Sequence, residues 1–385
     1  YFTAQIAQVT AKTSLDEQVI GYLNVAQDAM KVYQLQNALS WLNIRAIEEA
    51  YNDMAKSKTF DKVANQAKLV QLKQLIARGF SGIYKNDAAS LQAASKALSL
   101  KREILLANPV LDIDKIIVGR YKIGTTARQV NPRALGTQNN NWSNQTSASR
   151  GGFNAEIAEL SNLRGDIKTR TIFKPNNGSS VPDLKLHWDA ERLMFSMVDT
   201  DKRWQVFEVK LDGTGLKKLI ETPEKDLEFF DATYLPSGKI IAVSNIGYNG
   251  VPCVNGNDEV GNMCLYDPKD GSLRRLTFDQ DANWAPTVMN NGRIMYTRWE
   301  YTDLTHYFSR FVMHMNPDGT EQKSLYGSGS YFPNSTFDAK PLPGHPSQFI
   351  GVISGHHGVT RSGRLMLFDP SKSRKSEKGM LQELP

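Results

Sequence analysis

The sequence predicts an α-helical region followed by the four-stranded antiparallel blades of a β-propeller. Three observations predict this α+β class. Residues 22–78 contain neither glycine nor proline, whereas the chain after Pro109 alternates as strands do. A pair of hairpin signals then recurs, and matched positions such as Arg192, Lys239 and Arg293 are about 50 residues apart, as in propeller blades.

The first 110 residues are expected to form a helical bundle. Ser14 and Glu17 have the spacing of a capping box, in which each side chain accepts a hydrogen bond from the backbone N–H of the other residue. Further helices are predicted over residues 61–84 and 88–107, the last ending before Pro109. Apolar residues recur at helical spacing, namely Leu39, Leu42, Ala46, Ala50 and Met54. The region carries no catalytic signal, so we expect it to dock a protein partner or a larger assembly.

Residues 111–152 are expected to hold one strand and a surface loop. The strand is predicted over residues 114–124, where apolar residues alternate. Residues 136–152 are rich in Asn, Ser and Gly and too poor in apolar residues to form core.

The blades are predicted from residue 153 to residue 385. Asp-Gly pairs at Asp212, Asp270 and Asp318 each lie between two strand-like runs, and Gly supplies the positive φ of a tight turn. Another hairpin precedes each, beginning near Leu184 and Phe229 and at later matched positions. Two hairpins make one four-stranded unit.

The repeat is expected to be incomplete at both ends. Residues 156–160 and 168–173 are expected to be the outer two strands of an additional blade, and the last unit is expected to stop after its third strand, at residues 364–369. About four and a half blades would leave the ring open. We therefore expect this chain to be a fragment of a larger polypeptide or a product of cleavage.

Composition argues against nucleic-acid and membrane-spanning classes. The net charge is +6, but Lys and Arg are scattered and no aromatic residues interleave with basic runs. No apolar run approaches the ~18 residues that a transmembrane segment needs. The chain is expected to bind no nucleic acid and to have no transmembrane segment.

The two cysteines, Cys253 and Cys264, lie in one short segment. A disulfide between them would indicate an oxidising, extracytoplasmic compartment. Alternatively, Cys264 is a small buried apolar residue and Cys253 is free.

One end of the blades is expected to carry the functional site. The turns within the hairpins are tight, whereas the loops between second and third strands, and between units, are long and rich in reactive side chains. These loops gather a set of candidate residues at one face: Cys253, Glu300, Tyr301, His306, Tyr307, Arg310, His356 and His357.

The candidate roles each have a structural alternative. His356, His357 and Cys253 are candidate metal ligands, although the histidines lie between glycines and also suit a turn. Glu300, His306 and Tyr301 are candidate catalytic residues for acid–base chemistry, with inter-blade hydrogen bonds as the alternative.

Two arginines and nearby aromatic and amide groups are candidates for binding a ligand. Arg298 and Arg310 suit a carboxylate or sulfate, or an ion pair with a neighbouring acid. Trp299 suits stacking on a sugar, or a place in the core. Tyr307 and Asn334 complete the ligand-binding set. His187 and His314 lie within strands and are expected to be structural.

Several stretches together resemble the middle, propeller region of the hydrazine synthase alpha subunit family, whose many relatives have unknown activity. They include GFNAEIAEL, RLTFDQDANWAPTV, GRIMYTRWEYTD, SGHHGV and LMLFDP. The resemblance runs from about Leu105 to the C-terminus. It implies a propeller in a multi-subunit, extracytoplasmic complex, with c-type haem bound through Cys-x-x-Cys-His. This chain has no such motif.

Three functions are consistent with these observations. The first is a binding module for a ligand or partner in a larger extracytoplasmic assembly, which we favour because no complete catalytic set is present. The second is a haem- or metal-dependent oxidoreductase subunit whose cofactor motif lies outside this chain. The third is a carbohydrate-active propeller, a polysaccharide lyase or a glycan-binding protein.

Overall fold

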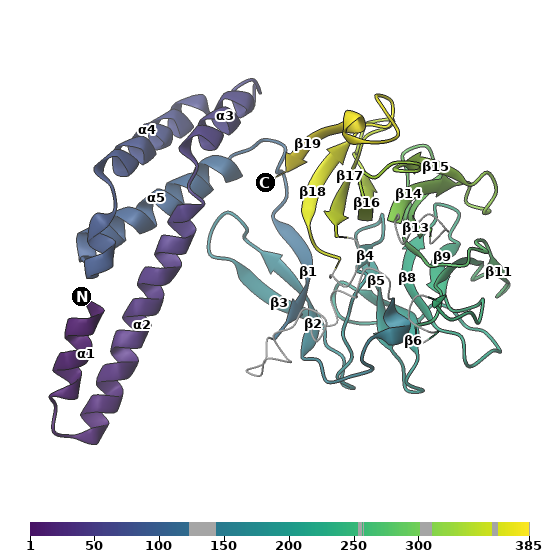
Figure 1. The fold of residues 1–385 in the computed structure, drawn as a ribbon, viewed down its shortest axis with the longest axis horizontal. Coiled ribbons are helices and arrows are strands. Elements are labelled where there is room, and N and C mark those ends of the chain that lie inside the picture. Colours follow the sequence, from purple (N-terminus) through teal and green to yellow (C-terminus); the bar gives the residue numbers. More distant parts are fainter. Residues whose placement is uncertain (123–143, 253–255, 257, 301–309, 356–360, 385) are drawn as a thin grey trace. The chain divides into compact units, whose positions relative to one another are not determined.

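The structure, a computed structural model, describes residues 1–122, 144–252, 256, 258–300, 310–355 and 361–384 (Figure 1). The chain forms two compact units. The helical unit comprises Tyr1–Lys115 and Ser161–Ile167, and the sheet unit comprises Ile116–Leu160 and Lys168–Pro385. None of the helices in the described ranges is both long and apolar enough to cross a membrane.

Five α-helices build the helical unit: α1 (Phe2–Thr10), α2 (Leu15–Ser40), α3 (Ile44–Met54), α4 (Lys62–Arg78) and α5 (Ala88–Leu106). The predicted cap of α2 is confirmed, because the Glu17 amide donates to the Ser14 hydroxyl at 3.5 Å. The run without Gly or Pro belongs to three helices, because Asn43 caps α3 and Asp61 caps α4, close to the predicted helix start at residue 61.

Two apolar clusters hold the helices together. The larger joins α3, α4 and α5 around Leu72 and Ile104, both fully buried. The smaller packs Val32 of α2 against Ala94 of α5. Helices α1 and α2 approach closely at Gly21, where an added Cβ would lie 2.7 Å from Val9.

The described strands from residue 185 to residue 384 form four antiparallel groups of four strands in chain order, which we call sheets. The last two groups are joined into one eight-stranded sheet. The first holds β4 (Lys185–Leu186), β5 (Arg192–Val198), β6 (Trp204–Lys210) and β7 (Lys217–Lys218). The second holds β8 (Phe229–Tyr234), β9 (Ile240–Ser244), β10 (Asn262–Tyr266) and β11 (Leu273–Arg275).

The third sheet holds β12 (Asn283–Val288), β13 (Ile294–Trp299), β14 (Arg310–Met315) and β15 (Lys323–Tyr326). The fourth holds β16 (Ser335–Pro341), β17 (Phe349–Ser354), β18 (Arg364–Phe368) and β19 (Met380–Leu384). A single parallel bridge, Arg310 to Ser335, joins these two sheets. Such up-and-down sheets are the form of propeller blades, and the fold is suggested by them, although the described strands do not close into a ring.

Two expectations about incomplete units need revision. The fourth sheet does not stop after its third strand, because β19 pairs with β18 from Leu365↔Leu384 onward. The segment 380–384 is short and mixes polar with apolar residues, so its sequence gives only a weak signal for a strand. The strands at 156–160 and 168–173 do form, as β2 (Ala155–Ser161) and β3 (Lys168–Phe173), but β1 (Lys115–Tyr121) lies beside β2 and makes a three-stranded sheet.

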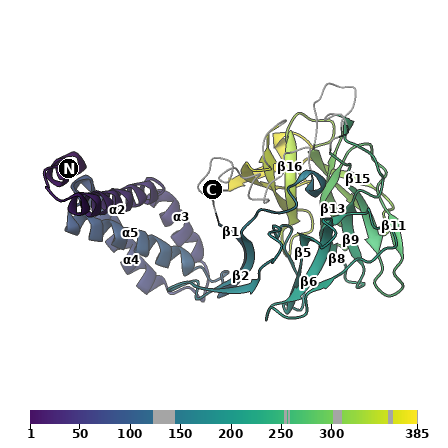
Figure 2. The ribbon, with the colours of Figure 1, turned by 90° about the horizontal axis from the view of Figure 1, so that it is seen from below.

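The first strand of each sheet packs on the preceding sheet. Strand β8 contacts β5 and β6, β12 contacts β8, and β16 contacts β12 and β13. Figure 2 labels β5, β8, β13 and β16, one strand from each of the four sheets. The pairing of these first strands is irregular, with a register shift after Phe230, Trp284 and Phe337, as a β-bulge produces.

Candidate functional site

The four first strands share an unusual backbone position. Asp183, Asp231, Ala285 and Asp338 each have a positive φ, of 62°, 44°, 54° and 51°. Three of them lie in the register shifts of β8, β12 and β16, and Asp183 lies two residues before β4. Aspartate tolerates this left-handed conformation better than most residues. We call Asp183, Asp231 and Asp338 the inner-strand aspartates.

Successive sheets are linked at this position by hydrogen bonds from backbone to carboxylate. The amide of Asp231 donates to Oδ2 of Asp183 at 3.1 Å. The amide of Ala285, in the next sheet, donates to Oδ2 of Asp231 at 2.5 Å. The carboxylates of Asp183 and Asp231 thus each accept a hydrogen bond from a backbone amide at the β-bulge of the following sheet. Ala285 interrupts the series, because it has no carboxylate to offer.

Asp183 is the most constrained of the three aspartates. Its Oδ2 also accepts from the hydroxyl of Ser196 at 2.5 Å and from the side-chain amide of Gln145 at 2.7 Å. Burial, and then the nearby charge of Asp231, raises the pKa of Asp183 from 3.8 to about 7. The fold therefore favours the protonated form of Asp183 relative to an exposed aspartate.

Cationic side chains meet beside these carboxylates. Lys185 and Lys340 each lie two residues after an inner-strand aspartate. The Lys340 ammonium donates to Oγ1 of Thr287 at 2.9 Å. Burial, followed by the charge of Lys185 and a hydrogen bond with it, lowers the pKa of Lys340 from 10.5 to about 7. Lys185 comes from the first sheet and Lys340 from the fourth, so the first strands of both sheets face a common centre.

Arg361, between β17 and β18, adds a third cation. Its guanidinium lies 4.5 Å from the ring centroid of Trp284 and 5.1 Å from that of Phe337. Burial lowers the pKa of Arg361, and the three inner-strand aspartates oppose that shift. We define the inner-strand cluster as Asp183, Lys185, Asp231, Asp338, Lys340 and Arg361.

A stack of rings holds Arg361 in place. The Trp284 and Trp299 rings are 6.2 Å apart with an interplanar angle of 17°. Arg310 lies against the second ring, with its guanidinium 4.6 Å from the centroid of the Trp299 ring. Each indole therefore has a cation over an electron-rich face.

The described candidates from the sequence lie in or beside this stack. Trp299 and Arg310 are 1% and 0% exposed, so both side chains are packed inside the sheet unit. Arg298 pairs with Asp279 at 2.9 Å and with Glu300 at 3.5 Å, which is the ion-pair alternative. The carbonyl of Asn334 accepts from the Arg310 amide at 3.2 Å.

The remaining candidates lie outside the described residues: Tyr301, His306, Tyr307, Cys253, His356 and His357. Cys264 is described, and it is a free, buried thiol that donates to the Ala242 carbonyl at 3.4 Å. The predicted disulfide is therefore not formed at Cys264, which fits the alternative of a small buried apolar residue. In the described ranges, no group of three or more His, Cys, Asp or Glu side chains is placed to hold a metal ion.

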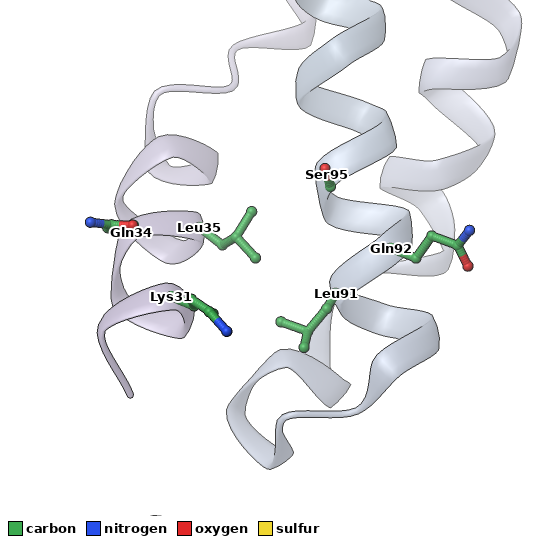
Figure 3. A pocket seen from close by; sticks show the side chains of 6 residues that line it. All are labelled: Lys31, Gln34, Leu35, Leu91, Gln92 and Ser95. Carbon is green, nitrogen blue, oxygen red and sulfur yellow. The ribbon is translucent and has the colours of Figure 1, made fainter. Parts of the chain in front are cut away.

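The helical unit has its own concave surface. A groove of about 480 Å³ between α2 and α5 is lined by six side chains (Figure 3), namely Lys31, Gln34, Leu35, Leu91, Gln92 and Ser95. Among these six, the one charged side chain is Lys31. The groove thus offers contact area without a group suited to catalysis.

The inner-strand cluster is hard to find from the sequence because binding residues concentrate in loops, whereas these residues lie on or beside inner strands. A signal was present: Phe-Asp-Ala occurs at both Phe230 and Phe337, with the aspartates at matched places in the repeat. What the sequence does not show is the positive φ, which turns each carboxylate toward the next sheet.

Comparison with known proteins gives no family. No family model matches the chain, and no curated protein matches it. Similar solved structures include hydrazine synthase of Kuenenia stuttgartiensis, with 14% identity and a TM-score of 0.49 over 70% of this chain and 39% of that one.

Two further structures are similar to a comparable extent. A putative TolB from Agrobacterium tumefaciens has 15% identity and a TM-score of 0.44 over 64% of this chain and 80% of that one. An oligogalacturonate lyase from Vibrio parahaemolyticus has 11% identity and a TM-score of 0.40 over 71% and 74%. At these scores the likenesses establish no activity, and this chain spans well under half of the hydrazine synthase chain.

Proposed function

We propose that the sheet unit is a section of a β-propeller that binds a small carboxylate ligand at the inner-strand cluster. The observation that carries this proposal is a gathering of cations at the first strands. Lys340 donates to Thr287 of β12, and the Arg361 guanidinium lies over Trp284 of the same strand. The charge of Lys185, from β4, acts on Lys340. Two ammonium groups repel each other in a poorly solvated place. A bound anion relieves that repulsion. The planar guanidinium of Arg361 has a geometry that suits two parallel hydrogen bonds to a carboxylate.

Two of the carboxylates of the cluster also have a structural role. Asp183 and Asp231 already accept backbone amides from the next sheet, so their charge serves the packing of the sheets. An added anion would favour the charged form of Lys340, whose pKa burial lowers to about 7.

The wider setting of the protein is part of the proposal. We infer that it acts as a binding module within a larger extracytoplasmic assembly, with the helical unit as its docking element. Support for docking comes from the exposed apolar side chains of α1 and α2. Acidic sugars belong to the proposed ligand class and connect this proposal with a glycan-binding protein.

Calorimetric titration tests the proposal. The probes are galacturonate, glutarate and citrate, each paired with an uncharged counterpart such as galactose. We expect at least one acid to bind at least tenfold more tightly than its counterpart, as roughly 1.4 kcal/mol of charge recognition gives. If no acid in the panel exceeds its neutral counterpart, the proposal is wrong.

A matched pair of variants locates the binding. Lys340→Met keeps the length of the side chain and removes its charge, and it should abolish the preference for acids. Lys217→Met removes a lysine of the same unit that pairs with Glu208 at 3.0 Å and lies outside the inner-strand cluster, and it should bind as the parent does. Equal binding by both variants would place the ligand elsewhere.

A further inference from the structure

Helix α2 is apolar on two opposite faces. One face packs within the helical unit: Gly21 meets Val9 of α1, and Val32 lies with Leu35 and Leu39 in the cluster that includes Ala94 of α5. Gly21, Val25, Val32, Leu35 and Leu39 recur at spacings of three, four or seven, as one face of a helix requires.

The second face is exposed. It carries Val19, Leu23, Ala26, Met30 and Tyr33, which we call the α2 stripe. Val19, Leu23, Met30 and Tyr33 are 49%, 58%, 56% and 64% exposed. At about 100° per residue the stripe spans an arc of roughly 80°, and its centre lies roughly 150° from that of the packed face. The packing of the helical unit therefore leaves this face uncovered.

The spacing of the stripe is typical of a surface on which two helices pair. Its members follow one another at intervals of four, three, four and three residues, which is the heptad pattern of a and d positions. The stripe is about 21 Å long, at 1.5 Å per residue. Isolated apolar side chains on a surface need no explanation, but a continuous seam of this kind indicates an interface.

The charges beside the stripe indicate which partner fits. Residues 18–27 carry no charged side chain, and the five residues at the flanking heptad positions are all uncharged, namely Ile20, Tyr22, Gln27, Ala29 and Gln34. Flanking charges are what select a different partner helix and reject a like one. Two copies of this seam therefore meet without repulsion.

The same composition disfavours a membrane surface. Helices that lie on membranes carry several Lys or Arg residues on the polar face. In α2 the single basic residue is Lys31, which pairs with Asp28 at 3.7 Å, and Asp16 and Glu17 lie in the first turn. Anionic lipid would be repelled more than attracted.

We propose that the α2 stripe is a self-association surface, on which α2 of a second copy of this chain packs. Stable interfaces bury at least about 1,200 Å² in total. Five side chains per copy bury an area at or below that limit. The dimer is therefore weak, with a dissociation constant in the micromolar range. It stands independently of ligand binding at the inner-strand cluster.

Sedimentation equilibrium of the full chain tests the proposal, at concentrations from roughly 1 to 200 µM around the expected dissociation constant. The parent chain should shift from monomer to dimer over this range. The Leu23→Glu/Met30→Glu double variant should remain a monomer with unchanged helical circular dichroism. Asn24→Glu, which adds charge at an exposed position off the stripe, should dimerise as the parent does.

Cross-linking provides a second readout. Ala26 lies at the middle of the stripe, so parallel and antiparallel pairing both bring its two copies together. Ala26→Cys should form a disulfide-linked dimer under mild oxidation, whereas Asn24→Cys should not exceed the parent chain treated alike. A parent chain that is monomeric throughout, or a double variant that still dimerises, would overturn the proposal. So would binding of the monomer to phosphatidylglycerol vesicles through the stripe.

The two proposals fail separately. The Leu23→Glu/Met30→Glu variant should retain the carboxylate binding of the parent, because its changes lie in the helical unit. Loss of dimerisation with intact ligand binding supports this inference. A dimer in a protein that binds no carboxylate leaves this inference intact and refutes only the proposed function.

Discussion

The amide nitrogen of Ala285 lies 2.5 Å from Oδ2 of Asp231 and joins two neighbouring sheets through a backbone group and a carboxylate. The amide of Asp231 makes the same bond to Asp183 in the preceding sheet. Apolar contacts between two sheets have no fixed direction. A hydrogen bond from a bulge amide to a charged carboxylate, in contrast, requires one geometry. This repeated bond therefore fixes how successive sheets meet.

Replacing Asp231 by Asn tests that bond. Asn keeps the shape and tolerates the φ of 44°, but its neutral carbonyl is a weaker acceptor for the amide of Ala285. Hydrogen bonds to charged groups contribute about 1.5–3 kcal/mol, so we expect a loss of roughly 1 kcal/mol in the free energy of unfolding. Urea denaturation followed by tryptophan fluorescence measures it. Asp201→Asn, in an exposed turn, is the control, and an equal loss in both variants would contradict the account.

Removal of one ring from the stack should be far more costly. Trp284 is fully buried and contacts both Arg361 and Trp299, so Trp284→Ala loses apolar contact and leaves a cavity. Such changes cost about 3–5 kcal/mol. Trp188 is 59% exposed, and Trp188→Ala should cost about 1 kcal/mol or less. Comparable losses in thermal denaturation of the two variants would show that the stack is not part of the core.

Stability should depend on pH through Asp183. Its folded pKa, about 7, lies above the unfolded value of 3.8. A carboxyl that holds its proton more tightly when folded stabilises the protein at low pH, and that stabilisation is lost as pH rises from about 4 to about 7. Asp183→Asn removes this dependence. The difference in unfolding free energy, parent minus variant, should therefore fall between pH 4 and pH 7 and be constant above pH 7.5. A difference that rises with pH in that window would contradict the assigned direction.

The cap of α4 gives a prediction for the helical unit. The carboxylate of Asp61 accepts from the Ala64 amide at 3.0 Å. Asp61→Ala leaves that amide without its partner, and losing such a cap costs about 1 kcal/mol. Asp53→Ala removes an exposed carboxylate that pairs with Lys56 at the surface, which is worth less than about 0.5 kcal/mol. Denaturation followed at 222 nm should separate the two variants, and a reversed order would refute the capping role.

The sequence predicted local structure well where one residue decides it. Ser14 caps α2 as its spacing with Glu17 indicates, and the Asp-Gly turns at Asp212 and Asp318 take the positive φ at glycine that the hairpin requires. The strand at β19 was missed, because a five-residue strand at a sheet edge depends on its partner β18 more than on its own pattern.

The site was harder to predict because it depends on contacts between sheets. Lys185 and Lys340 lie far apart in sequence, and neither has a neighbour that marks it as functional. Trp299 and Arg310 were singled out as ligand-binding groups by residue type. Their burial in one stack follows from the register of β13 and β14, in which they face each other. That register depends on the pattern of both whole strands and on the connection between them, and the type of a single residue does not show it.

The most direct test of the account is a crystal structure of the full chain grown with galacturonate. The account predicts the ligand carboxylate between the ammonium groups of Lys185 and Lys340, with the Arg361 guanidinium still stacked on Trp284. A carboxylate bound elsewhere, with an empty inner-strand cluster, would contradict it.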